Sequence, residues 1–364
     1  MSTPSPEPRE DHRGMDAHNA VMREIRGLNE QSYAPDAPTR VWMDEDNTPA
    51  GIVRSLTIIM NTGGCRWARA GGCTMCGYVA ESVEGGTVAH ADLMAQIDAA
   101  LAHEAGAAET PAAQVKIYTS GSFLDDREVP PETREAIAAR LGPRDRIVLE
   151  SLPDFVEPQK LRPFLAQGMA TDIAIGLETS SDRIRRDAVN KYFAFEAFEQ
   201  AAAAVASAGA AADPPAGIKA YLLLKPPFLA EGEAVEDMIS SIRDCAATAG
   251  VHTVSMNPTN VQSYTMVNEL YRAGGYRPPW LWSVAAVLRE TAADPVLVVS
   301  DPVGAGADRG AHNCGECDDL VYRAIKDFNL RQDPSVFDEV SCTCESAWDF
   351  VMAEETGYNQ PLIS

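Results

Sequence analysis

Residues 52–78 read IVRSLTIIMNTGGCRWARAGGCTMCGY. The stretch opens with an apolar, β-branched run, 52–60, which predicts a buried strand, and it continues directly into a glycine-rich loop. Three cysteines lie in that loop with the spacing C-x7-C-x2-C: Cys65, Cys73 and Cys76. Because α/β proteins place their chemistry at the carboxyl ends of parallel strands, this loop is the first candidate for a functional site.

Strand and helix signals alternate on the carboxyl side of this stretch. Runs rich in β-branched residues predict strands at 52–60, 115–119, 146–150, 172–177, 218–224, 252–256 and 296–300. Helical stretches are predicted at 91–104, 131–140, 159–167, 193–208, 233–249 and 279–292, and one more precedes the first strand at 17–31. The alternation is typical of parallel βαβ units and predicts an α/β fold. A full or partial (β/α) barrel is favoured over a doubly wound sheet.

We expect three parts along the chain. Residues 1–48 form an N-terminal helical extension, disordered in part because its first fifteen residues are rich in proline, serine and charge. Residues 49–305 form the barrel. Residues 306–364 form a small cysteine-rich tail with two short helices, which we expect to bind metal.

The chain is strongly acidic. Its 364 residues carry 30 Lys plus Arg against 53 Asp plus Glu, a formal net charge of −23, and only six of the basic residues are lysines. This composition favours a protein that works at high salt, where surface repulsion is screened, over an ordinary acidic cytosolic protein. Taken alone, the charge argues against a nucleic-acid partner. The apolar content of 45% excludes general disorder.

The sequence predicts a cytoplasmic protein. Residues 1–45 are charged throughout and contain no apolar signal segment. The longest uncharged small-residue run, 201–212, is too short and too weakly apolar to span a membrane. Cysteines in a reducing compartment remain thiols, so clustered cysteines indicate metal or redox chemistry rather than disulfides.

The number of cysteines in the first loop is informative. A structural zinc ion takes four ligands, and an ordinary electron-transfer [4Fe–4S] cluster takes four thiolates. Three thiolates without a nearby fourth would leave one iron of a cluster open for a substrate. The alternatives are a zinc site completed by a distant ligand and a coincidence of buried cysteines.

The three-cysteine loop resembles that of the radical S-adenosylmethionine (SAM) superfamily, and its long first gap resembles the Elongator-catalytic-subunit branch. The resemblance implies a [4Fe–4S] cluster on Cys65, Cys73 and Cys76. Its open iron chelates SAM, and one-electron reduction cleaves SAM to a 5′-deoxyadenosyl radical. The resemblance also implies SAM contacts by residues in the loop and at later strand ends, namely Tyr78, Ser120, Gly121, Ser122, Glu150 and Glu178.

Residues 64–78 and the segments SGSFLD (120–125), GLETS (176–180) and LKPP (224–227) are similar to a narrower group. This group comprises the archaeal radical SAM proteins of archaeosine biosynthesis, here of a haloarchaeal type. The resemblance implies tRNA as a partner, together with a subunit that attaches lysine to 7-cyano-7-deazaguanine in the D-loop. The radical SAM subunit then cleaves the C–N bond of the lysine side chain and leaves archaeosine. An electron donor such as ferredoxin or flavodoxin is also implied.

Two other classes of function stay open. One is another radical SAM tRNA-modifying enzyme, either Elongator-like or methylthiotransferase-like. It is disfavoured because the chain has no room for a further domain before the cysteine loop or after the barrel. The other is a non-catalytic iron–sulfur and zinc scaffold subunit, which does not explain the predicted SAM contacts.

A second cysteine group lies in the tail. Cys314 and Cys317 form C-x2-C, and Cys342 and Cys344 form C-x-C. Four thiolates predict a closed, tetrahedral structural zinc site, in which His312 could replace one cysteine. An auxiliary iron–sulfur cluster and free cysteines are the alternatives. Cys245 stands alone in a predicted helix and is interpreted as a small buried apolar residue.

The remaining candidates are polar residues for the substrate and arginines for tRNA phosphates. Polar residues at the later strand ends predict substrate contacts: Lys225, Asn257, Thr259, Asn260 and Gln262. Lys225 is followed by two prolines, so a rigid loop explains it equally well. Phosphate contacts are predicted for Arg183, Arg185 and Arg186, with a solvated helix face as the alternative.

Overall fold

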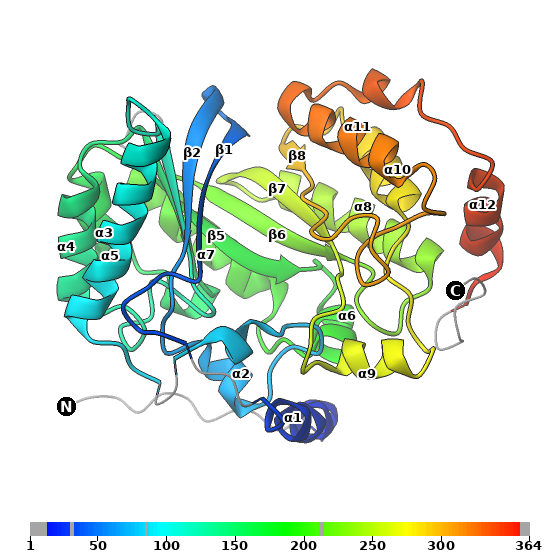
Figure 1. The fold of residues 1–364 in the computed structure, drawn as a ribbon, viewed down its shortest axis with the longest axis horizontal. Helices are drawn as coiled ribbons and strands as arrows, with labels where there is room; N and C mark the ends of the chain where they lie inside the picture. The colour runs from blue at the N-terminus through cyan, green and yellow to red at the C-terminus, as the bar shows by residue number, and fades with distance from the viewer. Residues whose placement is uncertain (1–12, 30–32, 84–85, 211–214, 357–364) are drawn as a thin grey trace.

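The computed structural model describes residues 13–29, 33–83, 86–210 and 215–356. Its centre is one eight-stranded sheet with the strands in chain order (Figure 1). The strands are β1 (Arg40–Thr48), β2 (Gly51–Ile59), β3 (Gln114–Tyr118), β4 (Arg146–Glu150), β5 (Ala170–Glu178), β6 (Ile218–Leu224), β7 (Val251–Pro258) and β8 (Leu297–Val299). β1 and β2 are antiparallel, and all later neighbours are parallel. No pairing joins β1 to β8 among these residues, so the barrel is partial.

Some of the helices cover the outer face of the sheet, and others lie along its lower edge in the view of Figure 1. They are α1 (Arg13–Arg26), α2 (Arg66–Ala70), α3 (His90–Ala107), α4 (Pro131–Leu141), α5 (Pro158–Leu165), α6 (Asp182–Ile184), α7 (Phe195–Gly209), α8 (Glu231–Ala247), α9 (Met266–Arg272), α10 (Leu281–Thr291), α11 (Asp318–Arg331) and α12 (Glu345–Glu354). Each predicted strand and each predicted inter-strand helix is present, with ends shifted by a few residues. None of the described helices combines the length and apolar character needed to cross a membrane.

The two faces of the sheet differ in composition, as β6 illustrates. Alternate residues from Ile218 to Leu224 are fully buried in the core beneath the helices. The residues between them, Lys219, Tyr221 and Leu223, point to the opposite side and are only half-buried. We call this side the inner face.

The inner face is concave. The hydroxyl groups of Tyr118 on β3 and Tyr221 on β6 lie 2.5 Å apart, although β4 and β5 separate their strands. Likewise, Nζ of Lys116 on β3 lies 2.5 Å from a carboxylate oxygen of Asp46 on β1, across β2. Side chains from strands that are not neighbours meet in this way only when the sheet curls around them.

The predicted boundary at residue 48 is wrong, because β1 belongs to the sheet. Its residues pair with β2 over the whole length of both strands, from Arg40 opposite Ile59 to Thr48 opposite Gly51. The segment RVWMDEDNT has little strand propensity of its own, so its pairing with β2 decides its conformation. The predicted helix 17–31 is α1, which ends at Arg26. Gln31 and residues 1–12 lie outside the described ranges.

The C-terminal tail is not a separate unit either. Val321 and Phe328 of α11 and Val351 of α12 belong to the same apolar core as the barrel strands. In addition, α11 packs against β1 and β8, and α12 packs against α8. The tail therefore closes the side of the partial barrel near β8 (Figure 1).

Candidate active site

The cysteine loop follows β2 at the carboxyl edge of the parallel sheet. Cys65 precedes the short helix α2, and Cys73 and Cys76 follow that helix. Cys73 is buried and the other two are half-buried; all three are free thiols. The three thiols interact electrostatically with one another, so they lie near one another in the loop. Three neighbouring thiols can bind three irons of one cluster and leave the fourth iron open.

The chemistry of these thiols fits a bound cation. Burial raises the pKa of Cys65 to about 11 and that of Cys73 to about 12, and it also raises the pKa of Cys76. All three would therefore hold a proton at neutral pH unless a metal replaced it. Lys191 lies near Cys73 and Arg26 near Cys76, and their charges favour the thiolates.

The shape of the loop depends on α1. The guanidinium of Arg26 donates hydrogen bonds to the carbonyl oxygens of Cys76 (2.7 Å), Cys73 (3.2 Å) and Ala68 (2.6 Å), and also to that of Gly71. The sequence prediction missed this role, because nothing local marks one arginine of an amphipathic helix as a loop anchor.

Asn19, also on α1, holds the glycines between the cysteines. Its Oδ1 accepts hydrogen bonds from Gly72 N (3.0 Å) and from Asn190 Nδ2 (2.9 Å). Gly71 has φ +137°, and a Cβ there would lie about 2.5 Å from Asn19. The loop and α1 are therefore fitted to one another, and only glycine allows the contact.

We predict that Arg26→Gln weakens both the loop and its capacity to hold a cluster. A hydrogen bond from a charged donor contributes about 1.5–3 kcal/mol, and the amide of Gln can replace part of the four bonds that Arg26 makes. The free energy of unfolding should therefore fall by about 2–4 kcal/mol. The variant should also retain less iron per chain than the wild type after anaerobic reconstitution. Arg23→Gln is the matched control, since Arg23 makes one exposed bond to Ala70 O (2.6 Å). Equal losses in the two variants would contradict the role of Arg26.

The loop after β3 contains the predicted Ser120, Gly121 and Ser122. Ser120 Oγ is buried and has no hydrogen-bond partner among the described residues. Its backbone oxygen accepts from Cys65 N (3.3 Å), and Ser120 lines one small cavity together with Tyr78. An orphaned hydroxyl beside the cysteine loop fits a polar ligand that is held there.

Glu128 joins this loop to the cysteine loop, a role that sequence reasoning missed. One carboxylate oxygen accepts from Ser122 N (2.8 Å), and the other accepts from Thr62 Oγ1 (2.7 Å). Gly121 packs so closely on this carboxylate that a Cβ would lie 2.0 Å from Oε1. Glu128 thus sets the distance between the loops after β2 and β3.

Glu128 should make stability depend on pH. Burial outweighs its two hydrogen bonds and raises the pKa of its carboxyl from 4.5 to about 7. The folded state then binds a proton more tightly than the unfolded state. The contribution of Glu128 to the free energy of unfolding is therefore complete below pH 4.5 and is lost as the pH rises to 7. The loss is about 3 kcal/mol. Denaturant titrations from pH 4.5 to 7 should show that the free energy of unfolding falls less with pH in Glu128→Gln than in the wild type. If the two free energies differ by the same amount at every pH, the role of Glu128 is contradicted.

Glu150 and Glu178 lie at the ends of β4 and β5, both half-buried. Glu150 Oε2 accepts from Thr119 N (2.9 Å), and burial raises the pKa of Glu150 to about 8. Glu178 has φ +69°, a conformation rare for a residue with a side chain, and it accepts from Lys191 Nζ (2.6 Å). The predicted strand-end residues therefore gather beside the cysteine loop, and Lys191 is an additional member.

The arginine prediction is wrong for Arg185, which is fully buried. Its guanidinium donates to the backbone oxygens of Thr179 (2.5 Å) and Leu177 (3.2 Å) and cannot reach a phosphate. A π-helical turn at Arg185–Val189 directs it inward. Arg183 and Arg186 are exposed, and Arg186 pairs with Asp187 (2.8 Å).

Lys225 is also wrong as a substrate contact. Its ammonium is buried and lies 2.7 Å from Glu231 and 3.6 Å from Glu355, so its charge is used in tying α8 to the end of α12. Thr259 is buried, with its hydroxyl bonded to Leu224 O (2.9 Å).

Three predicted substrate contacts keep accessible side chains. Asn257 and Asn260 are half-buried at and just beyond the end of β7. Gln262 Oε1 accepts from Gly77 N (2.6 Å), which brings the segment after β7 against the end of the cysteine loop.

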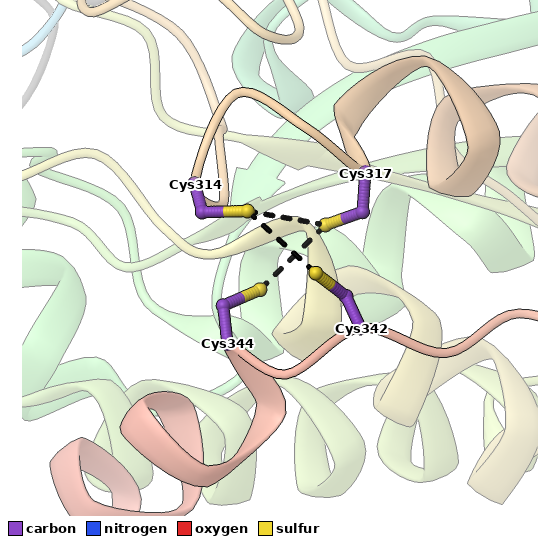
Figure 2. A group of neighbouring side chains, drawn as sticks. All are labelled: Cys314, Cys317, Cys342 and Cys344. Atoms are coloured by element: carbon purple, nitrogen blue, oxygen red, sulfur yellow. Dashed lines mark hydrogen bonds between the residues drawn. The ribbon is translucent and has the colours of Figure 1, made fainter.

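The second cysteine group is brought together in space (Figure 2). The sulfur atoms of Cys314 and Cys317 are 3.9 Å apart, those of Cys314 and Cys342 3.7 Å, and those of Cys317 and Cys344 3.6 Å. All four sulfurs lie within 4.8 Å of one another. Trp282 Nε1 donates to the Cys344 sulfur (3.2 Å), and Asn313 Nδ2 donates to that of Cys317 (3.3 Å). This is a closed set of four potential ligands around one point.

His312 is not one of these ligands. Its Nδ1 lies 2.8 Å from Gly310 O, and the ring is not part of the four-sulfur group. The turn that begins at Asn313 directs the cysteines, but not His312, toward the centre. Cys245 is fully buried in α8, which confirms its predicted packing role.

A curled α/β sheet with a three-cysteine loop at its carboxyl edge defines the class: the protein is a radical SAM enzyme. No protein-family model matches the chain. Archaeosine synthase subunit beta of Methanosarcina acetivorans is 40% identical over 354 residues, which cover 95% of this chain and 99% of that protein. The same subunit of Thermococcus kodakarensis is 36% identical over 320 residues, covering 85% and 95%. The chain belongs to the archaeosine synthase subunit beta family.

Solved structures with a similar fold include Elp3 of Methanocaldococcus infernus, at TM-score 0.46 and 14% identity, covering 65% of this chain and 59% of that one. Queuine lyase from Clostridium spiroforme, solved with SAM and queuine bound, has a TM-score of 0.44 and 17% identity, covering 62% and 83%.

Proposed function

We propose that the protein converts the lysine adduct of 7-cyano-7-deazaguanine in the tRNA D-loop to archaeosine by radical cleavage of the lysine C–N bond. The observation that carries the proposal is the identity of 40% with archaeosine synthase subunit beta over nearly the full length of both chains. The chemistry agrees with a radical enzyme, because an unactivated lysine methylene has no acidic proton that a general base could remove.

Three thiols and the neighbouring strand ends provide the reaction site. Cys65, Cys73 and Cys76 would hold a [4Fe–4S] cluster with one iron open to SAM. When both are bound and the cluster is reduced, the cluster and SAM together supply a carbon-centred radical that abstracts hydrogen. The chain itself holds SAM in place through Tyr78, Ser120, Gly121, Ser122, Glu150 and Glu178. Its further task is to hold the lysine methylene close to the reacting carbon and to exclude water.

The four tail cysteines would hold a structural zinc ion. Four sulfurs within 4.8 Å of one another suit the coordination sphere of a single ion. An auxiliary cluster instead takes each thiolate on a different iron, which requires a wider spacing. The bonds from Trp282 and Asn313 to the sulfurs would stabilise thiolates around the metal.

The tRNA has to be bound by a protein whose net charge is negative, without overall electrostatic attraction. At a net charge of −23, and in the high-salt cytoplasm that this composition suits, counterion release contributes little to affinity. Shape, stacking and placed arginines such as Arg183 and Arg186 are the remaining means of binding. Asn257, Asn260 and Gln262 would contact the modified base. A lysine-transferring subunit would supply the substrate and help to bind the tRNA, and a ferredoxin or flavodoxin would supply the electron.

The decisive experiment uses tRNA that carries the lysine adduct. Reconstituted protein, SAM and a reductant are incubated with it anaerobically, with and without the lysine-transferring subunit, and nucleosides are identified by mass spectrometry. We expect archaeosine to form and 5′-deoxyadenosine to accumulate. Adduct that stays intact while SAM is being cleaved would reject the archaeosine reaction and leave another radical SAM reaction in its place.

A further inference from the structure

Lys219 differs from every other lysine of the chain. All six lysines lie in the described ranges, and five have an ion-pair partner there. The pairs are Lys116–Asp46, Lys160–Glu157, Lys191–Glu178, Lys225–Glu231 and Lys326–Asp301. Lys219 has no ion pair with any described carboxylate, although acidic residues outnumber basic ones by 53 to 30. Its ammonium is therefore available to an anion from outside the chain.

The position of Lys219 favours a ligand. It lies near the start of β6 on the inner face and is half-buried. Its ammonium sits over the ring of Tyr221, 5.3 Å from the ring centre, which limits the directions in which it can point. A cation that is partly desolvated and held by a ring binds an anion more strongly than one on the open surface.

Two tyrosine hydroxyls adjoin this ammonium. Tyr118 and Tyr221 share one hydrogen bond of 2.5 Å, in which one hydroxyl donates and the other accepts. The accepting hydroxyl keeps its own hydrogen for a ligand. Burial raises the pKa of both tyrosines, so neither is ionised at neutral pH. An ammonium and a neutral hydroxyl donor together match the two oxygens of a carboxylate.

The surrounding acidic groups narrow the class of ligand. The ammoniums of Lys116 and Lys219 outweigh burial and lower the pKa of Asp46 to about 2, so Asp46 is an anion close to Lys219. Glu150 lies near Tyr221 on the same face. The negative charge of Asp46 disfavours a phosphate dianion. It favours a group that carries an ammonium beside its carboxylate, as the free end of an amino acid does.

The distance to the reaction site suits a lysine side chain. Glu150 on β4 and Lys219 on β6 both pair with Ala174 on β5, so they lie on one row across the sheet. Two strand spacings separate them, about 10 Å. Glu150 is one of the proposed SAM contacts, so an extended lysine could reach from the reacting atoms to Lys219.

We propose that Lys219, with Tyr118 and Tyr221, binds the α-carboxylate of the lysine that the substrate tRNA carries, and so anchors the amino-acid end on the inner face. This inference rests on the proposed function, since it assigns part of that substrate to a subsite. Lys219 is a specificity residue: it selects adducts that end in a carboxylate and positions the chain of methylenes.

The test compares two substrates and two proteins. One tRNA carries the lysine adduct and the other the adduct of pentane-1,5-diamine, which lacks only the carboxylate. We expect wild-type protein to favour the lysine adduct by about 10- to 100-fold in kcat/KM, mainly through KM. Lys219→Gln should lose this preference, and Lys219→Arg should recover part of it. Arg140→Gln, which removes an exposed positive charge from the helix α4, should keep the wild-type preference.

Binding without reductant separates the two proposals. Dissociation constants of both tRNAs are measured under conditions in which no turnover occurs. Discrimination by wild type but not by Lys219→Gln supports the subsite, even if the lysine adduct is never converted, in which case the archaeosine reaction alone fails. Equal discrimination by both proteins, or none by wild type, overturns the subsite and leaves the proposed function standing.

Discussion

Cys73→Ala is expected to reduce SAM cleavage to background while leaving the protein folded. Cys73 is the buried one of the three loop cysteines, and the two that remain cannot hold a cluster with a single open iron. The measurement is 5′-deoxyadenosine formed by anaerobically reconstituted, reduced protein, together with iron per chain and the absorption spectrum of the cluster. A variant that still cleaves SAM, or wild type that binds only zinc in this loop, would contradict the assignment.

Cys245→Ala is the matched control for this experiment. Cys245 is another fully buried cysteine, and it lies in α8 and belongs to neither cysteine group. Its loss should cost about 1 kcal/mol of stability through a small cavity. Iron content and SAM cleavage should stay at wild-type values. The pair of variants therefore separates loss of a ligand from loss of packing.

Cys317→Ser is expected to release the metal of the tail and to lower stability by several kcal/mol. Structural zinc contributes its binding free energy to folding, and Cys317 directly precedes α11, whose Val321 and Phe328 lie in the barrel core. A loss of this size should lower Tm by about 10 °C. Metal analysis and thermal unfolding are the measurements.

His312→Ala controls for disturbance of the same turn. His312 lies two residues before Cys314 but outside the four-sulfur group. The variant should therefore keep one zinc ion per chain. Zinc loss in this variant would contradict the four-cysteine site. Extra iron beyond the loop cluster in wild type, lost in Cys317→Ser, would instead establish an auxiliary cluster.

The sequence predicted the parallel strands and their helices because they obey local rules. Each strand from β2 onward contains β-branched or other apolar residues in a short run, and a helical stretch separates most of these runs. β1 escaped prediction because its acidic segment becomes a strand only through pairing with β2. The partial closure of the sheet could not be predicted either, since periodicity does not record whether edge strands meet.

Arg185 and Lys225 show why charged residues were harder to assign. Both follow strands of the barrel, where a solvated or ligand-binding side chain is the ordinary expectation. In the fold, backbone oxygens surround Arg185, and Glu231 and Glu355 surround Lys225. Partners that are distant in sequence decided their roles, and no local pattern records those partners.

The sequence by itself determined the chemistry available to this protein. The spacing of Cys65, Cys73 and Cys76 after a strand and the two cysteine pairs of the tail are local patterns, and ligand number follows from them directly. Tertiary structure decided what surrounds those ligands. It placed Arg26 against the carbonyl oxygens of the cysteine loop, Glu128 between two loops and Lys219 over the ring of Tyr221 on the inner face. These are contacts between distant segments, and only the curl of the sheet and the docking of α1 bring such segments together.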